Sequence, residues 1–298
     1  MKTVTYHIQR TVADKLVDYL ELSKVRLNIL VVFSSVLGYL IGYNESQNSF
    51  FELFFLTVGG FLVTASANTF NQILEKDFDA LMQRTQNRPL PAGRVSIQEA
   101  LIFGAITLIF GLVLLGAGIH PLAAILAFLS FFIYVFVYTP MKRISIVSVV
   151  IGAFPGAIPP LLGWVAATKS FGLEGGLLFA LQFAWQFPHF WLIARKGQED
   201  YLKAGYKIVP WDGKKDQLFK YLLAGSVWIM LPISFLSYYY QLNGKMYLWA
   251  AVLLGIIIWL TSVLYLKDEK KYFRNLIIYT LLYLPLIQLF YWFDKIWI

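Results

Sequence analysis

Long stretches without a charged side chain dominate this sequence. Eight of them are long enough to matter, at residues 27–44, 53–74, 100–141, 144–168, 175–194, 221–244, 246–266 and 275–293. A helix that crosses a bilayer needs about 20 mainly apolar residues. The stretch 100–141 is twice that length and holds Gly116, Gly118, His120 and Pro121 near its middle, where a tight turn is expected. Dividing it there predicts nine membrane spans.

These stretches are continuous apolar runs, which favour helices over the alternating strands of a membrane barrel. The sequence therefore predicts an all-α integral membrane protein with a bundle of nine transmembrane helices. Only 14% of the residues are charged, against about 25% in soluble domains, and this excludes a soluble enzyme. The chain has no cysteine, which excludes disulfides, a thiolate nucleophile and cysteine-ligated metals.

The basic side chains predict the orientation. With the N-terminus in the cytoplasm, the cytoplasmic segments 1–26, 75–99, 140–145, 195–220 and 267–274 hold 22 of the 25 lysines and arginines. This is the asymmetry that the positive-inside rule describes, and it places the C-terminus on the opposite side. The net charge of +8 thus reflects topology and does not point to a nucleic-acid partner. We expect a cytoplasmic arm at 1–26, partly an amphipathic helix. A single nine-helix domain at 27–294 follows, with long cytoplasmic loops at 75–99 and 195–220.

The first long loop begins with an acidic helix end. Asn71, Glu75 and Asp79 are spaced i, i+4, i+8, so their side chains line one helix face, while Asp77 falls near the opposite face. Hard oxygen ligands of this kind suit Mg²⁺, which commonly bridges to substrate phosphates. Acids at a helix C-terminus oppose the helix dipole, so stability alone does not explain them.

Basic side chains and two histidines are further candidates for the site. Arg84, Arg88 and Arg94 come just after the acidic face, and arginine grips phosphate through two parallel hydrogen bonds. Lys142 and Arg143 lie in the short loop after the fourth span. They could bind phosphate as well, or they could only reflect the positive-inside rule. His189 lies in an aromatic helix, where packing and substrate contact are both open. We expect His120, at a turn, to be structural.

At these residues the sequence resembles the UbiA-type intramembrane aromatic prenyltransferases, and within them the branch that farnesylates haem. The resemblance lies in five groups of segments: 23–26, 71–90, 138–143, 151–163, and 188–191 with 200–205. Two departures stand out: Glu75 replaces the usual middle Asp of the N-x-x-x-D-x-x-x-D motif, and the second acidic motif is not intact, with Asp200 its best counterpart.

The resemblance implies a central substrate cavity that opens at the cytoplasmic face of a bacterial inner-membrane enzyme. It implies Mg²⁺ as cofactor, with ligands Asn71, Glu75, Asp79 and Asp200. Haem B and farnesyl diphosphate would be the substrates, haem O the product, and haem A synthase a downstream partner. His189 would contact haem. The residues implied in diphosphate binding are Arg84, Arg88, Lys142, Arg143, Lys24, Arg26 and Lys196.

Other functions remain open from the residues alone. A quinone or chlorophyll prenyltransferase would share the acidic motif and differ in its acceptor. A transporter or channel is disfavoured because the spans hold no Asp, Glu, Lys or Arg in their interiors, so no ion path is visible. A haem-carrying respiratory subunit would need paired membrane histidines, and His120 and His189 fall at opposite faces of the predicted topology.

Overall fold

The computed structural model of the chain describes residues 11–208 and 216–296, so the first ten residues of the predicted arm lie outside it. Its helices are, in chain order, α1 (Val12–Leu22), α2 (Val25–Gly42), α3 (Phe50–Asp79), α4 (Ile97–Gly118), α5 (Pro121–Phe132), the π-helix η1 (Ile133–Tyr138), α6 (Thr139–Met141), α7 (Ser148–Thr168), α8 (Gly172–Lys196), α9 (Gln198–Lys203), α10 (Asp216–Tyr239), α11 (Lys245–Lys267) and α12 (Glu269–Ile296).

The predicted nine spans are confirmed. Within the described residues, nine helical segments are long and apolar enough to cross a membrane, and the fourth of them, Pro121–Met141, combines α5, η1 and α6. The long apolar run divides at the predicted turn, where His120 caps α5 and its Nδ1 atom accepts a hydrogen bond of 3.3 Å from the Leu122 amide. His120 therefore has the structural role that its position predicted.

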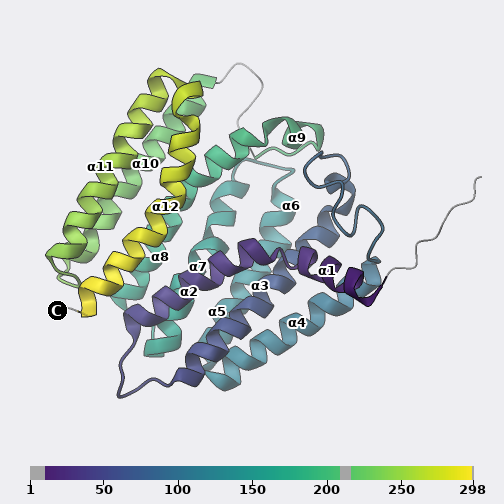
Figure 1. Cartoon of the computed structure of the whole chain (residues 1–298), viewed down its shortest axis with the longest axis horizontal. Coiled ribbons are helices and arrows are strands. Elements are labelled where there is room, and N and C mark those ends of the chain that lie inside the picture. The colour runs from purple at the N-terminus through teal and green to yellow at the C-terminus, as the bar shows by residue number, and fades with distance from the viewer. Residues whose placement is uncertain (1–10, 209–215, 297–298) are drawn as a thin grey trace, which may run out of the picture.

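The long connections lie together at one end of the bundle. The segment between α3 and α4 and the short helix α9 share that end, and the C-terminus lies at the other (Figure 1). Arg195 near the end of α8 pairs with Glu269 at the start of α12, with 2.8 Å between Nε and Oε1. The end of α8 and the beginning of α12 therefore lie together at this same end of the bundle.

A close crossing of α2 and α7 forms the centre of the bundle. A Cβ atom at Gly38 would lie 2.1 Å from the carbonyl oxygen of Pro160, and one at Gly163 would lie 1.8 Å from that of Ser35. Both glycines are therefore required for the two backbones to approach each other, which is how small residues promote helix packing in membranes.

A π-helical turn, η1, interrupts the fourth span just before its end. The Thr139 hydroxyl donates a 2.8 Å hydrogen bond to the Tyr134 carbonyl, five residues back. Such turns change the face on which the following side chains emerge, and they are frequent at functional sites. Here the turn sets the directions of Tyr138, Thr139 and the following Lys142. The sequence did not predict it.

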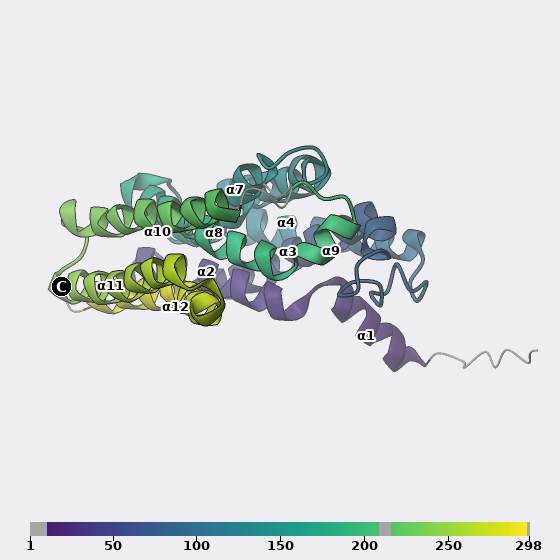
Figure 2. The ribbon, with the colours of Figure 1, turned by 90° about the horizontal axis from the view of Figure 1, so that it is seen from above.

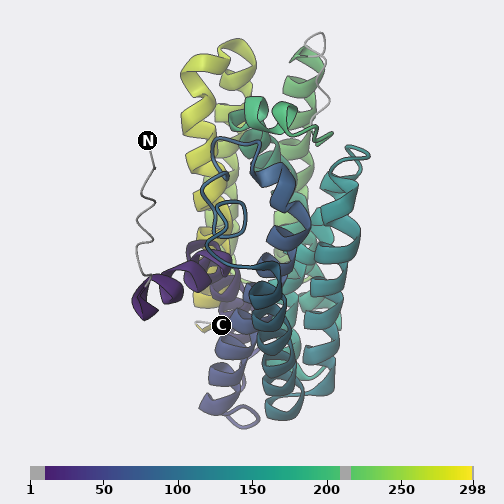
Figure 3. The ribbon, with the colours of Figure 1, turned by 90° about the vertical axis from the view of Figure 1, so that its right-hand side faces the viewer.

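The helix α1 has the amphipathic character predicted for the arm. Its inner face places Leu22 against Leu90, Val95 and Ala100. Its outer face exposes an apolar stripe with i, i+4, i+8 spacing, listed with exposed fractions as Val12 88%, Leu16 61% and Leu20 47%. The helix extends from the loop end of the bundle (Figure 2) and crosses the direction of the spans (Figure 3). This arrangement is typical of a helix that lies in the membrane interface.

We expect the outer face of α1 to lie in lipid, and the absence of cysteine makes this testable with single labels. A spin label at Leu16→Cys in proteoliposomes should collide more with dissolved oxygen than with a water-soluble nickel chelate. A label at Lys15→Cys is the matched control, because Lys15 forms an exposed pair with Glu99 that contributes little stability. That label should show the opposite preference. Equal exposure of both labels to the chelate would contradict the interfacial position.

Candidate active site

The acidic face of α3 is buried at the loop end of the bundle. Asn71, Glu75 and Asp79 are 2%, 4% and 0% exposed, and α3 continues as a helix through Asp79. Asp77, on the other face, is exposed. The predicted helical register is therefore confirmed, and it brings the three oxygen-bearing side chains to one place.

Each of these three side chains meets a cation from a different segment. Arg88 forms an ion pair with Asp79, with 2.6 Å between NH1 and Oδ2. Lys142 pairs with Glu75. Lys24 donates a 3.1 Å hydrogen bond from Nζ to the Asn71 side-chain oxygen. Buried carboxylates persist only when they are paired or ligate a metal, and these cations fulfil that condition. We call this group of six residues the charged cluster.

The amide of Asn71 ties the charged cluster together. Its Nδ2 atom donates to Oε2 of Glu75 at 2.9 Å and to the Thr139 hydroxyl at 3.1 Å. Because Thr139 directly follows the π-helical turn, the geometry of that turn positions the fourth span against α3. Asn71 thus orients Glu75 and leaves its own side-chain oxygen to Lys24.

Lys24 occupies an unusual backbone position at the start of α2. Its φ angle is 48°, in the left-handed region that residues other than glycine seldom adopt. The pKa of the Lys24 ammonium is lowered to about 7, mainly by burial and secondly by repulsion from the Arg88 guanidinium. An anion bound nearby would favour the charged form and oppose this shift. Lys24 is thus placed to respond to an anionic ligand.

The oxygen ligands of the charged cluster fit Mg²⁺. Among the described residues, no three histidine or acidic side chains gather as a metal site by themselves. However, Asn71, Glu75 and Asp79 offer the hard oxygens that Mg²⁺ prefers, and this ion typically uses only one or two carboxylates with water and substrate phosphates. One of these oxygens, Oδ1 of Asp79, is buried without a hydrogen-bond partner.

Asp200 lies next to the site but has a different partner. Its two carboxylate oxygens accept hydrogen bonds of 3.2 Å from the backbone amides of Gln83 and Arg84. It thereby fastens the segment after α3 to α9, and the Arg84 guanidinium lies 5.9 Å from the centre of the Tyr201 ring. The role of Asp200 as a metal ligand stays a prediction.

The remaining predicted basic residues differ in their relation to the cluster. Arg143 lies beside it: its NH2 atom donates to the Leu74 carbonyl at 2.9 Å, and its guanidinium lies 3.4 Å from the centre of the Phe78 ring. Arg26 and Lys196 are exposed, and within the described part of the chain no hydrogen bond or ion pair joins either to the cluster. Their diphosphate roles stay predictions.

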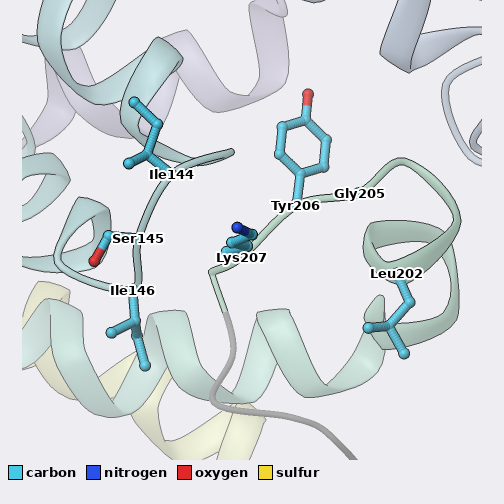
Figure 4. A pocket seen from close by; sticks show the side chains of 7 residues that line it. All are labelled: Ile144, Ser145, Ile146, Leu202, Gly205, Tyr206 and Lys207. Carbon is cyan, nitrogen blue, oxygen red and sulfur yellow. The ribbon is translucent and has the colours of Figure 1, made fainter.

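Tyrosines around Lys142 were missed by the sequence reasoning. The Lys142 ammonium lies 4.9 Å from the centre of the Tyr138 ring and 5.5 Å from that of Tyr206, distances at which aromatic faces stabilise cations. Tyr138 precedes Lys142 by one helical turn, a spacing that could have revealed it. Tyr206 could not be found in this way, because it arrives from the segment after α9. That segment lies beside residues 144–146 (Figure 4), and the Lys207 amide donates to the Lys142 carbonyl at 2.8 Å.

An apolar cavity of about 430 Å³ extends into the bundle between α2, α3, α5, η1, α7, α8 and α12. His189 lines it, stacked on Trp185 with 4.7 Å between ring centres and with its Nδ1 atom 3.1 Å from the Thr280 hydroxyl. Tyr138 lines the cavity and also flanks Lys142. The cavity and the charged cluster are therefore neighbours, joined by the end of the fourth span.

Fold and site together define a membrane-embedded protein in which a buried cluster of acidic and basic side chains adjoins an apolar cavity. The chain belongs to the UbiA prenyltransferase family, whose pattern matches residues 31–291.

Two protoheme IX farnesyltransferases are similar to the chain over nearly its whole length. The protoheme IX farnesyltransferase of Cytophaga hutchinsonii is 41% identical, over 96% of this chain and 100% of that protein. The mitochondrial protoheme IX farnesyltransferase of Arabidopsis thaliana is 35% identical, over 91% of this chain and 63% of that protein.

Solved structures share the fold. A digeranylgeranylglyceryl phosphate synthase has a TM-score of 0.79 at 24% identity, over 96% of this chain and 100% of that chain. A UbiA homologue from Archaeoglobus fulgidus bound to DMAPP and Mg²⁺ has a TM-score of 0.63 at 16% identity, over 94% of this chain and 99% of that one. At these identities the likeness concerns the fold alone.

The charged cluster predicts unequal effects at two neighbouring aspartates. Asp79→Asn removes a buried charge that faces Arg88, and we expect prenyl transfer by membranes to fall at least about 100-fold, the effect of losing one strong electrostatic contact in a site. Asp77→Asn is the matched control, since exposed substitutions change stability by only about 0.5 kcal/mol. It should retain activity within about threefold of the wild type at equal protein level on an immunoblot. Equal losses in the two variants would contradict the assigned helix face.

The pair between Lys142 and Glu75 predicts a stability effect that reverses in a double variant. Lys142→Met leaves a carboxylate buried without its cation, which costs about 3–5 kcal/mol. We therefore expect a clear fall in the unfolding temperature of the detergent-purified protein. Adding Glu75→Gln should recover most of the loss, because the remaining amide is neutral. A double variant as unstable as the sum of the single ones would show that the two residues are not coupled.

Proposed function

We propose that this protein transfers the farnesyl group of farnesyl diphosphate to a vinyl group of haem B, with haem O and diphosphate as products. The observation that carries the proposal is the charged cluster beside an apolar cavity, in a chain that shares 41% identity with a protoheme IX farnesyltransferase along its whole length. The cluster offers groups for the diphosphate, and the apolar lining of the cavity suits the farnesyl chain and the porphyrin ring.

Basic residues of the cluster would bind the diphosphate. Lys24, Arg88 and Lys142 already contact the acidic face of α3. Arg143 lies beside it, and Arg84 lies in the segment that follows α3, against the Tyr201 ring. Asn71, Glu75 and Asp79 would hold Mg²⁺, as would Asp200 if its carboxylate left the amides that it now caps. Bound there, the metal would neutralise negative charge that develops on the leaving diphosphate. The Archaeoglobus fulgidus homologue of the same fold was solved with Mg²⁺ and DMAPP, which supports a divalent cation here.

The reaction that we propose breaks the bond between C1 of the farnesyl chain and the bridging oxygen, and the electron pair leaves with diphosphate. The resulting allylic cation is attacked by the π bond of a haem vinyl group. Water adds to the cation formed next to the porphyrin ring and releases a proton to solvent. Tyr134, Tyr138, Trp185 and Phe190 line the cavity, where aromatic faces stabilise a cation and limit early attack by water.

The haem would occupy the cavity next to His189. This side chain is held by Trp185 and Thr280, so its orientation is fixed before a ligand binds. A prenyltransferase that acts on a quinone precursor is the second candidate, because it would use the same charged cluster and differ only in the acceptor that the cavity holds. The positive-inside distribution supports an orientation in which the charged cluster and the N-terminus face the cytoplasm.

One experiment separates these proposals. Membranes that contain the protein are incubated with haem B, farnesyl diphosphate and Mg²⁺, and the haem fraction is weighed by mass spectrometry. We expect a haem whose mass has increased by one farnesyl group (C15H25) and one hydroxyl group (OH). EDTA should abolish the product, and an excess of Mg²⁺ should restore it. A parallel incubation replaces haem B with 4-hydroxybenzoate; farnesylation of that acceptor, with haem left unchanged in the first incubation, would contradict the haem assignment.

A further inference from the structure

A ring of polar side chains closes the inner end of the cavity. Ser34 comes from α2, Gln182 from α8 and Gln288 from α12, and all three line the cavity. Gln182 and Gln288 are the cavity residues farthest along α8 and α12 from the loop end of the bundle. We call these three residues the polar layer.

The polar layer is hydrogen-bonded within itself. The Ser34 hydroxyl donates to Oε1 of Gln182 at 2.7 Å, and Nε2 of Gln288 donates to the same oxygen at 3.1 Å. Gln182 is in turn fixed to α7, because its Nε2 atom donates to the Gly156 carbonyl at 2.8 Å. All three side chains are buried. A group that entered the layer would break these bonds, and leaving a buried polar group unpaired costs about 1–3 kcal/mol.

The distance from the charged cluster to the polar layer matches the length of one farnesyl chain. Lys24, which contacts Asn71 in the charged cluster, immediately precedes the first residue of α2, and Ser34 lies on α2 ten residues further along. At about 1.5 Å per residue, the layer lies about 15 Å along α2 from the cluster. With C–C bonds of about 1.5 Å in a zigzag, a farnesyl chain of three isoprene units extends about 14 Å. A fourth unit would reach into the layer.

We propose that the polar layer stops the isoprenoid chain and so selects farnesyl diphosphate over longer homologues. This inference rests on the proposed function, since it assumes that the diphosphate lies at the charged cluster and the chain in the cavity. The end of a farnesyl chain fits above the layer and leaves its hydrogen bonds intact. A geranylgeranyl chain must either fold back or displace the amides of Gln182 and Gln288. Holding helices together is a second role for such amides, and that role makes no distinction between chain lengths.

The test compares two donors in one assay. We expect the wild type to favour farnesyl over geranylgeranyl diphosphate in kcat/KM with haem B as acceptor. Gln288→Ala removes one amide and opens space at the inner end, and it should shift this ratio toward the longer donor by at least about tenfold, since a single methylene in a hydrophobic pocket changes selectivity by about 10–200-fold. Ser34→Ala, a smaller change that the fold should tolerate, should shift it in the same direction.

Thr261→Ala is the matched control. Thr261 is buried and bonds a backbone carbonyl on α11, and it is not among the residues that line the cavity. It should leave the donor ratio unchanged even where it lowers stability. An unchanged ratio in both Gln288→Ala and Ser34→Ala would overturn the proposal and leave only the helix-packing role.

A binding measurement separates this proposal from the function on which it rests. Thermal stabilisation of the purified protein by each diphosphate is measured without haem. Stronger stabilisation of the wild type by farnesyl diphosphate, with the preference lost in Gln288→Ala, supports the length stop whatever the acceptor is. If the wild type farnesylates haem but binds both donors alike, or if Gln288→Ala keeps the wild-type preference, the proposed function stands and the length stop is wrong. If the wild type transfers nothing to haem and still shows the binding preference, the reverse holds.

Discussion

The structure depends on the neutralisation of two buried carboxylates at the end of α3. Glu75 and Asp79 are almost entirely shielded from solvent, and a carboxylate in such a place must be paired, protonated or bound to a metal. Their partners, Lys142 and Arg88, come from different connections. The requirement for counter-charges therefore draws the segment after α3 and the end of the fourth span onto one helix. With Lys24 added from the start of α2, much of the loop end of the bundle is organised around about two turns of α3.

A second set of contacts fixes the segment that carries Arg88. The Arg94 guanidinium pairs with Asp18 at 2.7 Å between Nε and Oδ1, and with Glu21, both on α1. Asp200 accepts hydrogen bonds from backbone amides of the same segment on its other side. A loop of this length would otherwise be mobile. Because it is held from both sides, Arg88 reaches Asp79 in a defined position, and the amphipathic arm and α9 become structural supports of the site.

Features that the sequence predicted well are those that depend on one helix at a time. The nine spans follow from runs of uncharged residues, and the shared face of Asn71, Glu75 and Asp79 follows from helical spacing. The partners of these residues follow from tertiary approach, which spacing does not report. Tyr206 is more than 60 residues from Lys142 in the chain, and the π-helical turn before Thr139 has no signature in composition. Asp200 shows the same limit: its position near the site could be expected, but its hydrogen bonds to a loop backbone could not.

The cavity lies between two polar boundaries of different kinds. At the loop end, charges are compensated by charges, and the same groups would exchange partners on binding the anion and the metal that we propose. At the inner end, the amides of Gln182 and Gln288 are neutral and satisfy each other, so they gain nothing from an apolar ligand and lose hydrogen bonds if they are displaced. A substrate with one charged and one apolar end is therefore oriented by both boundaries together: its charge is attracted to the first, and its apolar end is stopped by the second. The wall of the cavity between the two boundaries is formed by the uncharged stretches of the sequence, and its length sets the chain length that is selected.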